Sequence, residues 1–160
     1  MKKKSILNLV WQIGLVILLV GLDRWVKGYI TANFRPGEIF GEIPFVADFM
    51  YVRNTGAAFS VLSENTMLLT VISVIFLIAV VVYKIVRKPK HLMENIAVVL
   101  FFAGGLGNAI DRIQYQFVVD FIDIKWFDFP VFNIADMAVV GGAIAAVLYV
   151  LFFDKEKTNE

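Results

Sequence analysis

Two aspartates, Asp120 and Asp136, are the side chains in this sequence best suited to do chemistry. They stand among large apolar residues in the stretch 101–136, which reads FFAGGLGNAIDRIQYQFVVDFIDIKWFDFPVFNIAD. Burial raises the pKa of a carboxyl group, and a second carboxylate nearby pushes the two pKa values apart. A close carboxyl pair that shares one proton can hydrolyse an amide, because one member activates water while the protonated member polarises the carbonyl. This chemistry needs no metal ion or other cofactor, no histidine and no cysteine.

Each acid also has a simpler interpretation. Asp136 taken alone fits a helix cap, and Asp120 could form an ion pair with Lys125 or Arg112 at the rim of the protein. Perturbed acids are common in structural networks as well as in active sites. Two further acids compete for the same role but lie in the more polar stretch DIKWFDFP, which favours solvated positions: Asp123 and Asp128.

Polar residues around the two acids have helical spacing. Asn108, Asp111 and Arg112 lie at i, i+3 and i+4, so Asn108 shares a helix face with both charged residues. Asn133 precedes an apolar run and is expected to be its N-cap. Asp136 then falls at the third helical position, where the positive end of the helix dipole meets a carboxylate and holds it in place.

The composition indicates a membrane protein. The chain has 160 residues, of which 59% are hydrophobic and only 18% are charged, and its net charge is +1. Soluble domains carry about 45–50% apolar residues, so the excess is expected to face lipid. The near-zero net charge argues against a nucleic-acid partner. There are no cysteines, and the single histidine, His91, lies in a basic loop, so thiol chemistry and a histidine-based triad are disfavoured.

Four apolar runs are long enough to cross a bilayer. We expect one membrane-embedded domain over 1–160, mainly α-helical: a four-helix bundle with a small extracytoplasmic β-sheet formed by about 34–63. That segment is rich in Ile, Phe, Val and Tyr, alternates in part, and is interrupted by Gly and Pro. The expected spans are about 5–22, 67–86, 92–110 and 137–153.

Basic residues set the expected orientation. They gather at Lys2–Lys4 and in the loop 84–91, whereas acids outnumber bases in 23–65 and in 111–136. The positive-inside rule therefore places both termini and the 84–91 loop in the cytoplasm. Asp120 and Asp136 then lie near the outer face, and so do Asp23 and Lys27, an i,i+4 pair that is either a solvated ion pair or a support for the site.

Five motifs occur in order along the chain. They are Asp23-x-x-x-Lys27, Asn54-Thr55-Gly56-Ala57-Ala58-Phe59, Gly107-Asn108-x-x-Asp111-Arg112, Val119-Asp120-Phe121 and Phe132-Asn133-x-Ala135-Asp136. With these motifs between four spans, the chain resembles lipoprotein signal peptidase (signal peptidase II), a bacterial membrane aspartyl peptidase family. The resemblance covers almost the whole chain, and Arg24, where the family often has Gln, is a minor departure.

The resemblance implies an activity and a set of roles. The family removes the signal peptide from diacylglyceryl-modified prolipoproteins by cutting before the lipidated cysteine, in the bacterial inner membrane. It implies lipid contact and no cofactor, and we expect a monomer. The region from Val61 to Asn65 matches a mobile part of the family fold. The implied roles are catalysis by Asp120 and Asp136, substrate binding by Asn54, Asn108, Arg112 and Asn133, and support by Asp23, Lys27, Gly56, Gly104, Asp111 and Ala135.

Two other classes of protein remain in view. A small proton- or ion-coupled transporter would also carry acids and glycines in its spans, but it predicts acids near the bilayer centre and repeat symmetry. A structural membrane-assembly protein would give the polar set around Asp120 no purpose. Gly104, Gly105 and Gly107 fit either close passage of a substrate or tight helix packing.

Overall fold

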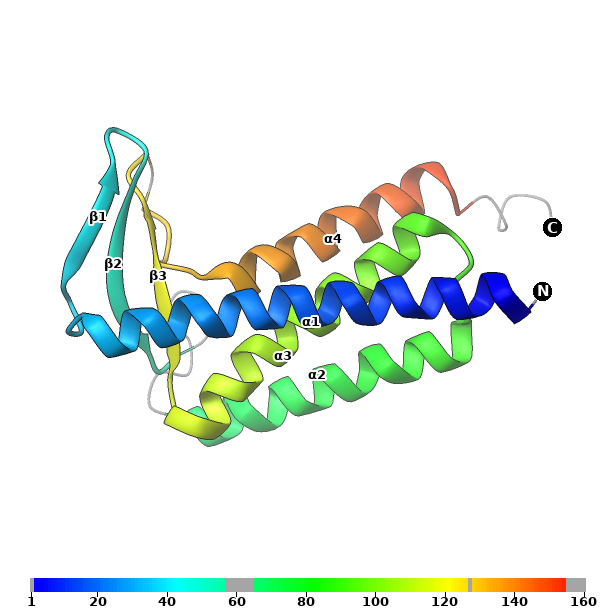
Figure 1. The fold of residues 1–160 in the computed structure, drawn as a ribbon, viewed down its shortest axis with the longest axis horizontal. Coiled ribbons are helices and arrows are strands. Elements are labelled where there is room, and N and C mark those ends of the chain that lie inside the picture. The colour runs from blue at the N-terminus through cyan, green and yellow to red at the C-terminus, as the bar shows by residue number, and fades with distance from the viewer. Residues whose placement is uncertain (1, 57–64, 127, 155–160) are drawn as a thin grey trace.

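The described part of the chain forms four helices and a three-stranded sheet at one end of them (Figure 1). The computed structural model describes residues 2–56, 65–126 and 128–154. The helices are long and apolar enough to cross a membrane. In chain order the elements are α1 (Lys2–Asn33), β1 (Ile39–Ile43), β2 (Ala47–Asn54), α2 (Thr66–Arg87), α3 (Leu92–Tyr115), β3 (Val118–Ile124) and α4 (Ile134–Phe152).

Helix α3 is the centre of the bundle and packs against each of the other three helices. Small residues allow its closest contact, which is with α4. A methyl group on Gly104 would lie 2.7 Å from Cγ2 of Val139 and closer still to the carbonyl oxygen of Ala135. The glycines therefore serve tight helix packing here, one of the two interpretations that the sequence left open.

The helices extend beyond the expected span limits. Helix α1 continues to Asn33 instead of ending near 22, and α3 continues to Tyr115 instead of 110. The reason is that charged residues near these points are paired inside the protein: Asp23 and Lys27 are buried, and so is Asp111. Helix α4 begins at Ile134 because Asn133 caps it.

The sheet has the order β1-β2-β3, with both pairs antiparallel. Strands β1 and β2 come from the expected 34–63 segment, whereas residues 57–64, which include most of the Val61–Asn65 region, lie outside the described residues. The third strand, β3, was not expected. It pairs with β2 over its length and places Asp120 opposite Val52.

A small apolar core holds the sheet against the end of α1. Ile30 of α1 is buried with Tyr51, Val119 and Phe121 of the sheet, and Phe34 packs against this group. Gln116 ends α3 in the left-handed region at φ 62°, so the chain turns sharply from α3 into β3. The short turn fixes Asp120 next to the end of α3.

We predict that Gly104→Ala destabilises the protein by about 1–3 kcal/mol, because the added methyl group meets the backbone of α4, which cannot move aside cheaply. The measurement is thermal unfolding in detergent. The control is Gly14→Ala in α1, where nothing lies within 4 Å of the added group. That variant should be unchanged or more stable by up to about 1 kcal/mol. Equal stability of the two variants would contradict the close α3–α4 contact.

Candidate active site

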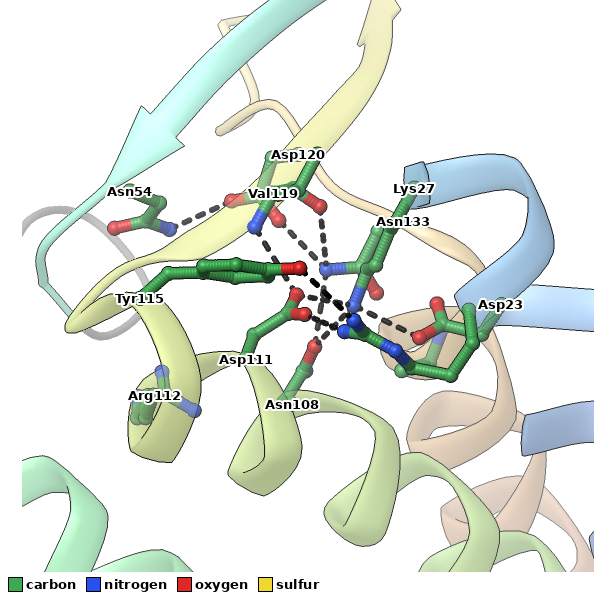
Figure 2. Close-up of polar contacts among 12 residues, drawn as sticks. Asp23, Lys27, Asn54, Asn108, Asp111, Arg112, Tyr115, Val119, Asp120 and Asn133 are labelled. Atoms are coloured by element: carbon green, nitrogen blue, oxygen red, sulfur yellow. Dashed lines mark hydrogen bonds and ion pairs between the residues drawn. The ribbon is translucent and has the colours of Figure 1, made fainter. Parts of the chain in front are cut away.

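Asp120 and Asp136 face one cavity. Three asparagines bind them, and Figure 2 shows these asparagines around Asp120: Asn54, Asn108 and Asn133. Asp120 lies in β3 and is 1% exposed. Its Oδ2 accepts a hydrogen bond of 2.7 Å from Nδ2 of Asn54 in β2. Its Oδ1 accepts one of 2.6 Å from Nδ2 of Asn133. Both oxygens of this buried carboxyl group therefore have amide donors.

Asp136 lies in the first turn of α4 and is part of a capping box. Its Oδ1 accepts a hydrogen bond of 2.7 Å from Nδ2 of Asn108, and its Oδ2 accepts one of 3.1 Å from the backbone N–H of Asn133. The backbone N–H of Asp136 in turn donates to Oδ1 of Asn133 at 2.9 Å. The predictions that Asn133 is the N-cap and that Asp136 is the third helical residue are confirmed.

The environment of Asp120 favours its protonated form. Burial and then the negative charge of Asp136 raise the pKa of Asp120 to about 7. The hydrogen bonds from Asn54 and Asn133 act in the opposite direction, because they stabilise the carboxylate. Asp120 is therefore poised to hold or release a proton near neutral pH.

The cavity has a volume of about 570 Å³ and is mostly apolar. Its polar lining is Asn54, Asn108, Arg112, Asp120 and Asp136. Its apolar walls include Met137, Val140 and Ile144 of α4, all more than half exposed on the outside of the bundle. A cavity with such walls opens sideways, toward the lipid that surrounds a membrane-spanning helix.

A buried ionic cluster lies behind the aspartate pair. Nζ of Lys27 is 2.9 Å from Oδ2 of Asp23 and 2.9 Å from Oδ2 of Asp111, and it donates to Oδ1 of Asn108 at 3.0 Å. Lys27, Asp23 and Asp111 are each 1% exposed or less. Of the two interpretations of the Asp23–Lys27 pair, the solvated ion pair is therefore wrong.

The cluster also ties down the elements that carry the aspartates. Oδ1 of Asp23 accepts the backbone N–H of Ala135 at the start of α4 (3.1 Å). Oδ2 of Asp111 accepts the backbone N–H of Val119 in β3 (3.2 Å). A methyl group on Gly107 would lie 2.9 Å from Oδ2 of Asp23. The positions of α4 and β3 thus both depend on this cluster.

Gly56 and Arg112 complete the side of the cavity near β2. The backbone N–H of Gly56 donates to Oδ1 of Asn54 at 2.9 Å, which fixes the amide so that its Nδ2 faces Asp120. Arg112 is directed to the carbonyl oxygen of Gly56 (3.4 Å) and to Oγ of Ser73 (3.5 Å). Its charge is close enough to act on both aspartates.

The structure separates other candidates from this group. Lys125 pairs with Glu42 (3.1 Å) and Asp48 (2.7 Å), and neither of its ion pairs involves Asp120. Asp123 lies further along β3, at a position paired with Asp48. Asp128 is exposed. His91 caps α3 at the far end of the bundle and stacks on Phe153, so it is remote from the aspartates.

Arg24 is the residue that sequence reasoning undervalued. Its Nη1 is paired with Oδ1 of Asp111, and its Nη2 donates to Oε1 of Gln114 at 3.0 Å. With Arg24 the four charges of the cluster cancel. The signal available in the sequence was its place beside Asp23.

Comparison with known proteins agrees with this arrangement. Residues 15–152 match the family model of signal peptidase (SPase) II. The chain belongs to the signal peptidase II family. The lipoprotein signal peptidase of Streptococcus pneumoniae is 36% identical over 99% of this chain and 99% of its own. That of Enterococcus faecalis is 35% identical over 86% of each chain.

Solved structures show the same fold. One bacterial membrane enzyme superposes with a TM-score of 0.85 at 35% identity and covers 93% of this chain and 92% of its own. A second gives a TM-score of 0.80 at 36% identity, with 89% and 93% covered. These similarities and the four membrane-length helices among the described residues show that this member of the signal peptidase II family is a multi-pass membrane peptidase.

We predict that Lys27→Met destabilises the protein by about 3–5 kcal/mol, because it leaves the buried carboxylates of Asp23 and Asp111 without their shared cation. Thermal or denaturant unfolding in detergent measures the change. Lys125→Met is the matched control, since Lys125 also pairs with two carboxylates but lies at the surface. Its unfolding should be nearly that of the parent protein. A similar loss in both variants would contradict the role given to the buried cluster.

Proposed function

We propose that this chain is an aspartic-type endopeptidase in which Asp120 and Asp136 are the catalytic pair. Membership of the family makes prolipoproteins its substrates and removal of their signal peptides its reaction. The observation that carries the aspartic mechanism is the convergence of two carboxyl groups on one cavity, with a pKa of about 7 for Asp120. A carboxyl pair with one proton is suited to amide hydrolysis.

The roles of the pair follow from their surroundings. We assign the shared proton to Asp120, and the N–H donors of Asn108 and Asn133 stabilise the carboxylate form of Asp136. Asp136 takes a proton from water, whose oxygen forms a bond to the scissile carbonyl carbon. Asp120 gives its proton to the carbonyl oxygen. The C–N bond then breaks, the proton on Asp136 goes to the leaving nitrogen, and Asp120 recovers its proton as the new carboxyl group forms.

The shape of the cavity supports a lipid-borne substrate. Its apolar walls and sideways opening suit the acyl chains of a diacylglyceryl-modified cysteine and the apolar signal segment before it. We therefore place cleavage just before that cysteine, with Asn54, Asn108, Arg112 and Asn133 holding the polar backbone of the scissile region. The excess of basic residues at Lys2–Lys4 and in 84–91 supports cytoplasmic termini in the bacterial inner membrane and a site near its outer face.

The transporter alternative gains no support. It requires acids near the middle of the spans. In the described helices, Asp23, Asp111 and Asp136 lie at the end near the sheet, and Glu94 lies in the first turn of α3 at the opposite end. An acid pair at a bundle end beside an extended strand is better suited to cutting a peptide than to passing an ion. We propose that the peptidase acts as a monomer.

Replacing either catalytic aspartate should abolish cleavage. In Asp120→Asn or Asp136→Asn, processing of a diacylglyceryl-modified precursor in detergent should fall by about a thousandfold or more, because the pair acts as a unit. Asp123→Asn is the matched control, since Asp123 lies on the same strand but outside the hydrogen-bonded group. It should cleave at nearly the parental rate. Cleavage retained by either of the first two variants, with the fold verified by thermal unfolding, would sink the assignment.

The pKa of Asp120 predicts the pH dependence. Asp120 loses its proton as the pH rises through about 7, so kcat/KM should fall on that alkaline side. Asn54→Ala removes a donor that stabilises the carboxylate, so the pKa of Asp120 should rise and the alkaline limb should move up by about one pH unit. Asn33→Ala, at the exposed end of α1, should leave the profile unchanged. A limb that stays in place or moves to lower pH in Asn54→Ala would contradict the assignment.

A further inference from the structure

The turn between β1 and β2 presents an aromatic residue in an unfavourable backbone conformation. The turn consists of Ile43, Pro44, Phe45 and Val46, and the N–H of Val46 donates to the carbonyl oxygen of Ile43 at 3.0 Å. Phe45, its third residue, has a φ of 63°. Proline at the second position and a positive φ at the third match a type II turn, in which glycine or asparagine normally takes the third position. A bulky side chain there is strained.

In this strained turn the ring of Phe45 is exposed and not buried. Phe45 is 87% exposed, the highest value among the exposed large hydrophobic residues. Trp126, which follows β3, is 70% exposed, and its indole N–H donates to the carbonyl oxygen of Phe45. Ile43 and Val46 are exposed beside them. Glycine would fit the third position of this turn without strain. A strained and exposed phenylalanine there indicates that its ring contacts a partner outside the chain.

The position of this tip along the bundle indicates what that partner is. The sheet packs against Val26, Ile30 and Phe34 of α1. On the same stretch of α1, Trp25 and Tyr29 are exposed. Trp and Tyr gather where a membrane-spanning helix meets the headgroup region. The sheet therefore lies at the level of the membrane interface, and Figure 1 shows its β1–β2 end projecting sideways from the bundle past the start of α4.

The charges and polar groups near the tip are arranged for contact with lipid. Lys125 next to Trp126 forms ion pairs with Glu42 and Asp48, so its positive charge is compensated and one net negative charge remains in this group. The indole N–H of Trp126 is already hydrogen-bonded, so its ring can enter an apolar layer without leaving a donor unsatisfied. The tip thus presents apolar rings with few unpaired polar groups around them.

We propose that Phe45 and Trp126 form an anchor that inserts into the lipid interface beside α4. Ile124, two residues before Trp126, lines the catalytic cavity, and the lipid-exposed α4 residues Val140 and Ile144 line its other side. The anchor fixes the edge of the sheet against the bilayer at the side where the cavity opens. A substrate that arrives within the membrane then meets the strand that carries Asp120 at a fixed depth.

Substitutions of Phe45 are expected to weaken membrane anchoring without lowering the stability of the fold. Asn and Gly both tolerate a positive φ, so Phe45→Asn and Phe45→Gly remove the ring while relieving the turn. In detergent, their melting temperatures should equal or exceed that of the parent protein. In phosphatidylcholine vesicles, we expect kcat/KM for a membrane-borne precursor to fall about tenfold, while kcat/KM in micelles stays close to the parental value.

The depth of the tip in the membrane is measured by the fluorescence of Trp126. The chain has three tryptophans, and Trp11→Phe with Trp25→Phe leaves Trp126 as the reporter. In vesicles of phosphatidylcholine brominated at different depths, Trp126 should be quenched most by bromines near the headgroup, and Phe45→Asn should weaken that quenching about twofold or more. Phe45→Trp is made in the chain that keeps Trp11 and Trp25 and is assayed by cleavage. It should retain the parental kcat/KM in vesicles.

Three results would overturn the proposal. One is a Trp126 that brominated lipids do not quench. Another is quenching of Trp126 that the Phe45→Asn substitution leaves unchanged. The third is an equal loss of kcat/KM in micelles and vesicles, which would assign the tip to contact with the substrate polypeptide and not with lipid.

Discussion

One buried ammonium group, that of Lys27, holds the parts of this site together. It lies between the carboxylates of Asp23 and Asp111 and also donates to Asn108. Removing three charged groups from water is expensive, and the cost is offset only when good geometry and further hydrogen bonds satisfy each of them. Here those further bonds reach the start of α4 and the start of β3. The elements that carry Asp136 and Asp120 are thus positioned by the two carboxylates that Lys27 holds together.

A layer of amides separates this cluster from Asp120 and Asp136. Because Lys27 donates to the Oδ1 of Asn108, the Nδ2 of Asn108 must face Asp136. Asn133 donates to Asp120, to Asn108 and to the carbonyl oxygen of Val119. Amides carry no titratable proton, so a proton on the pair has no neighbouring acid in this layer to move to. The buried ionic cluster, which positions α4 and β3, is therefore separated by these amides from the proton on Asp120 and Asp136.

Much of this arrangement could be predicted from local sequence, because its causes are local. The Asn133–Asp136 cap depends on a spacing of three residues, and the packing role of Gly104 depends on its lack of a side chain. Strand β3 could not be predicted in this way, because its pairing with β2 joins residues far apart in the chain. The burial of Asp120 was predicted from its apolar neighbours and is confirmed, whereas its position opposite Val52 of β2 follows from no local pattern.

Arg24 and Phe45 escaped prediction for a related reason. A charged residue in an apolar helix indicates the end of a span unless its partner on another helix is known, and Asp111 lies 87 positions away. The turn at Pro44 is predictable, but phenylalanine in its third position contradicts the preference of that turn. Such disagreements between local preference and structure are expected where a residue serves a contact outside its own fold.

The start of α4 shows that Asp136, which we propose to be catalytic, is also a structural residue. The first backbone N–H groups of a helix have no partners within it, and in a membrane protein they need partners from side chains. Asn133 accepts the N–H of Asp136, and Asp23 accepts that of Ala135. Asp136 itself accepts the N–H of Asn133, a bond that would weaken on protonation of Asp136 in the proposed reaction. Because Asp23 and Asn133 accept the two helical N–H groups, the start of α4 is held independently of the charge on Asp136.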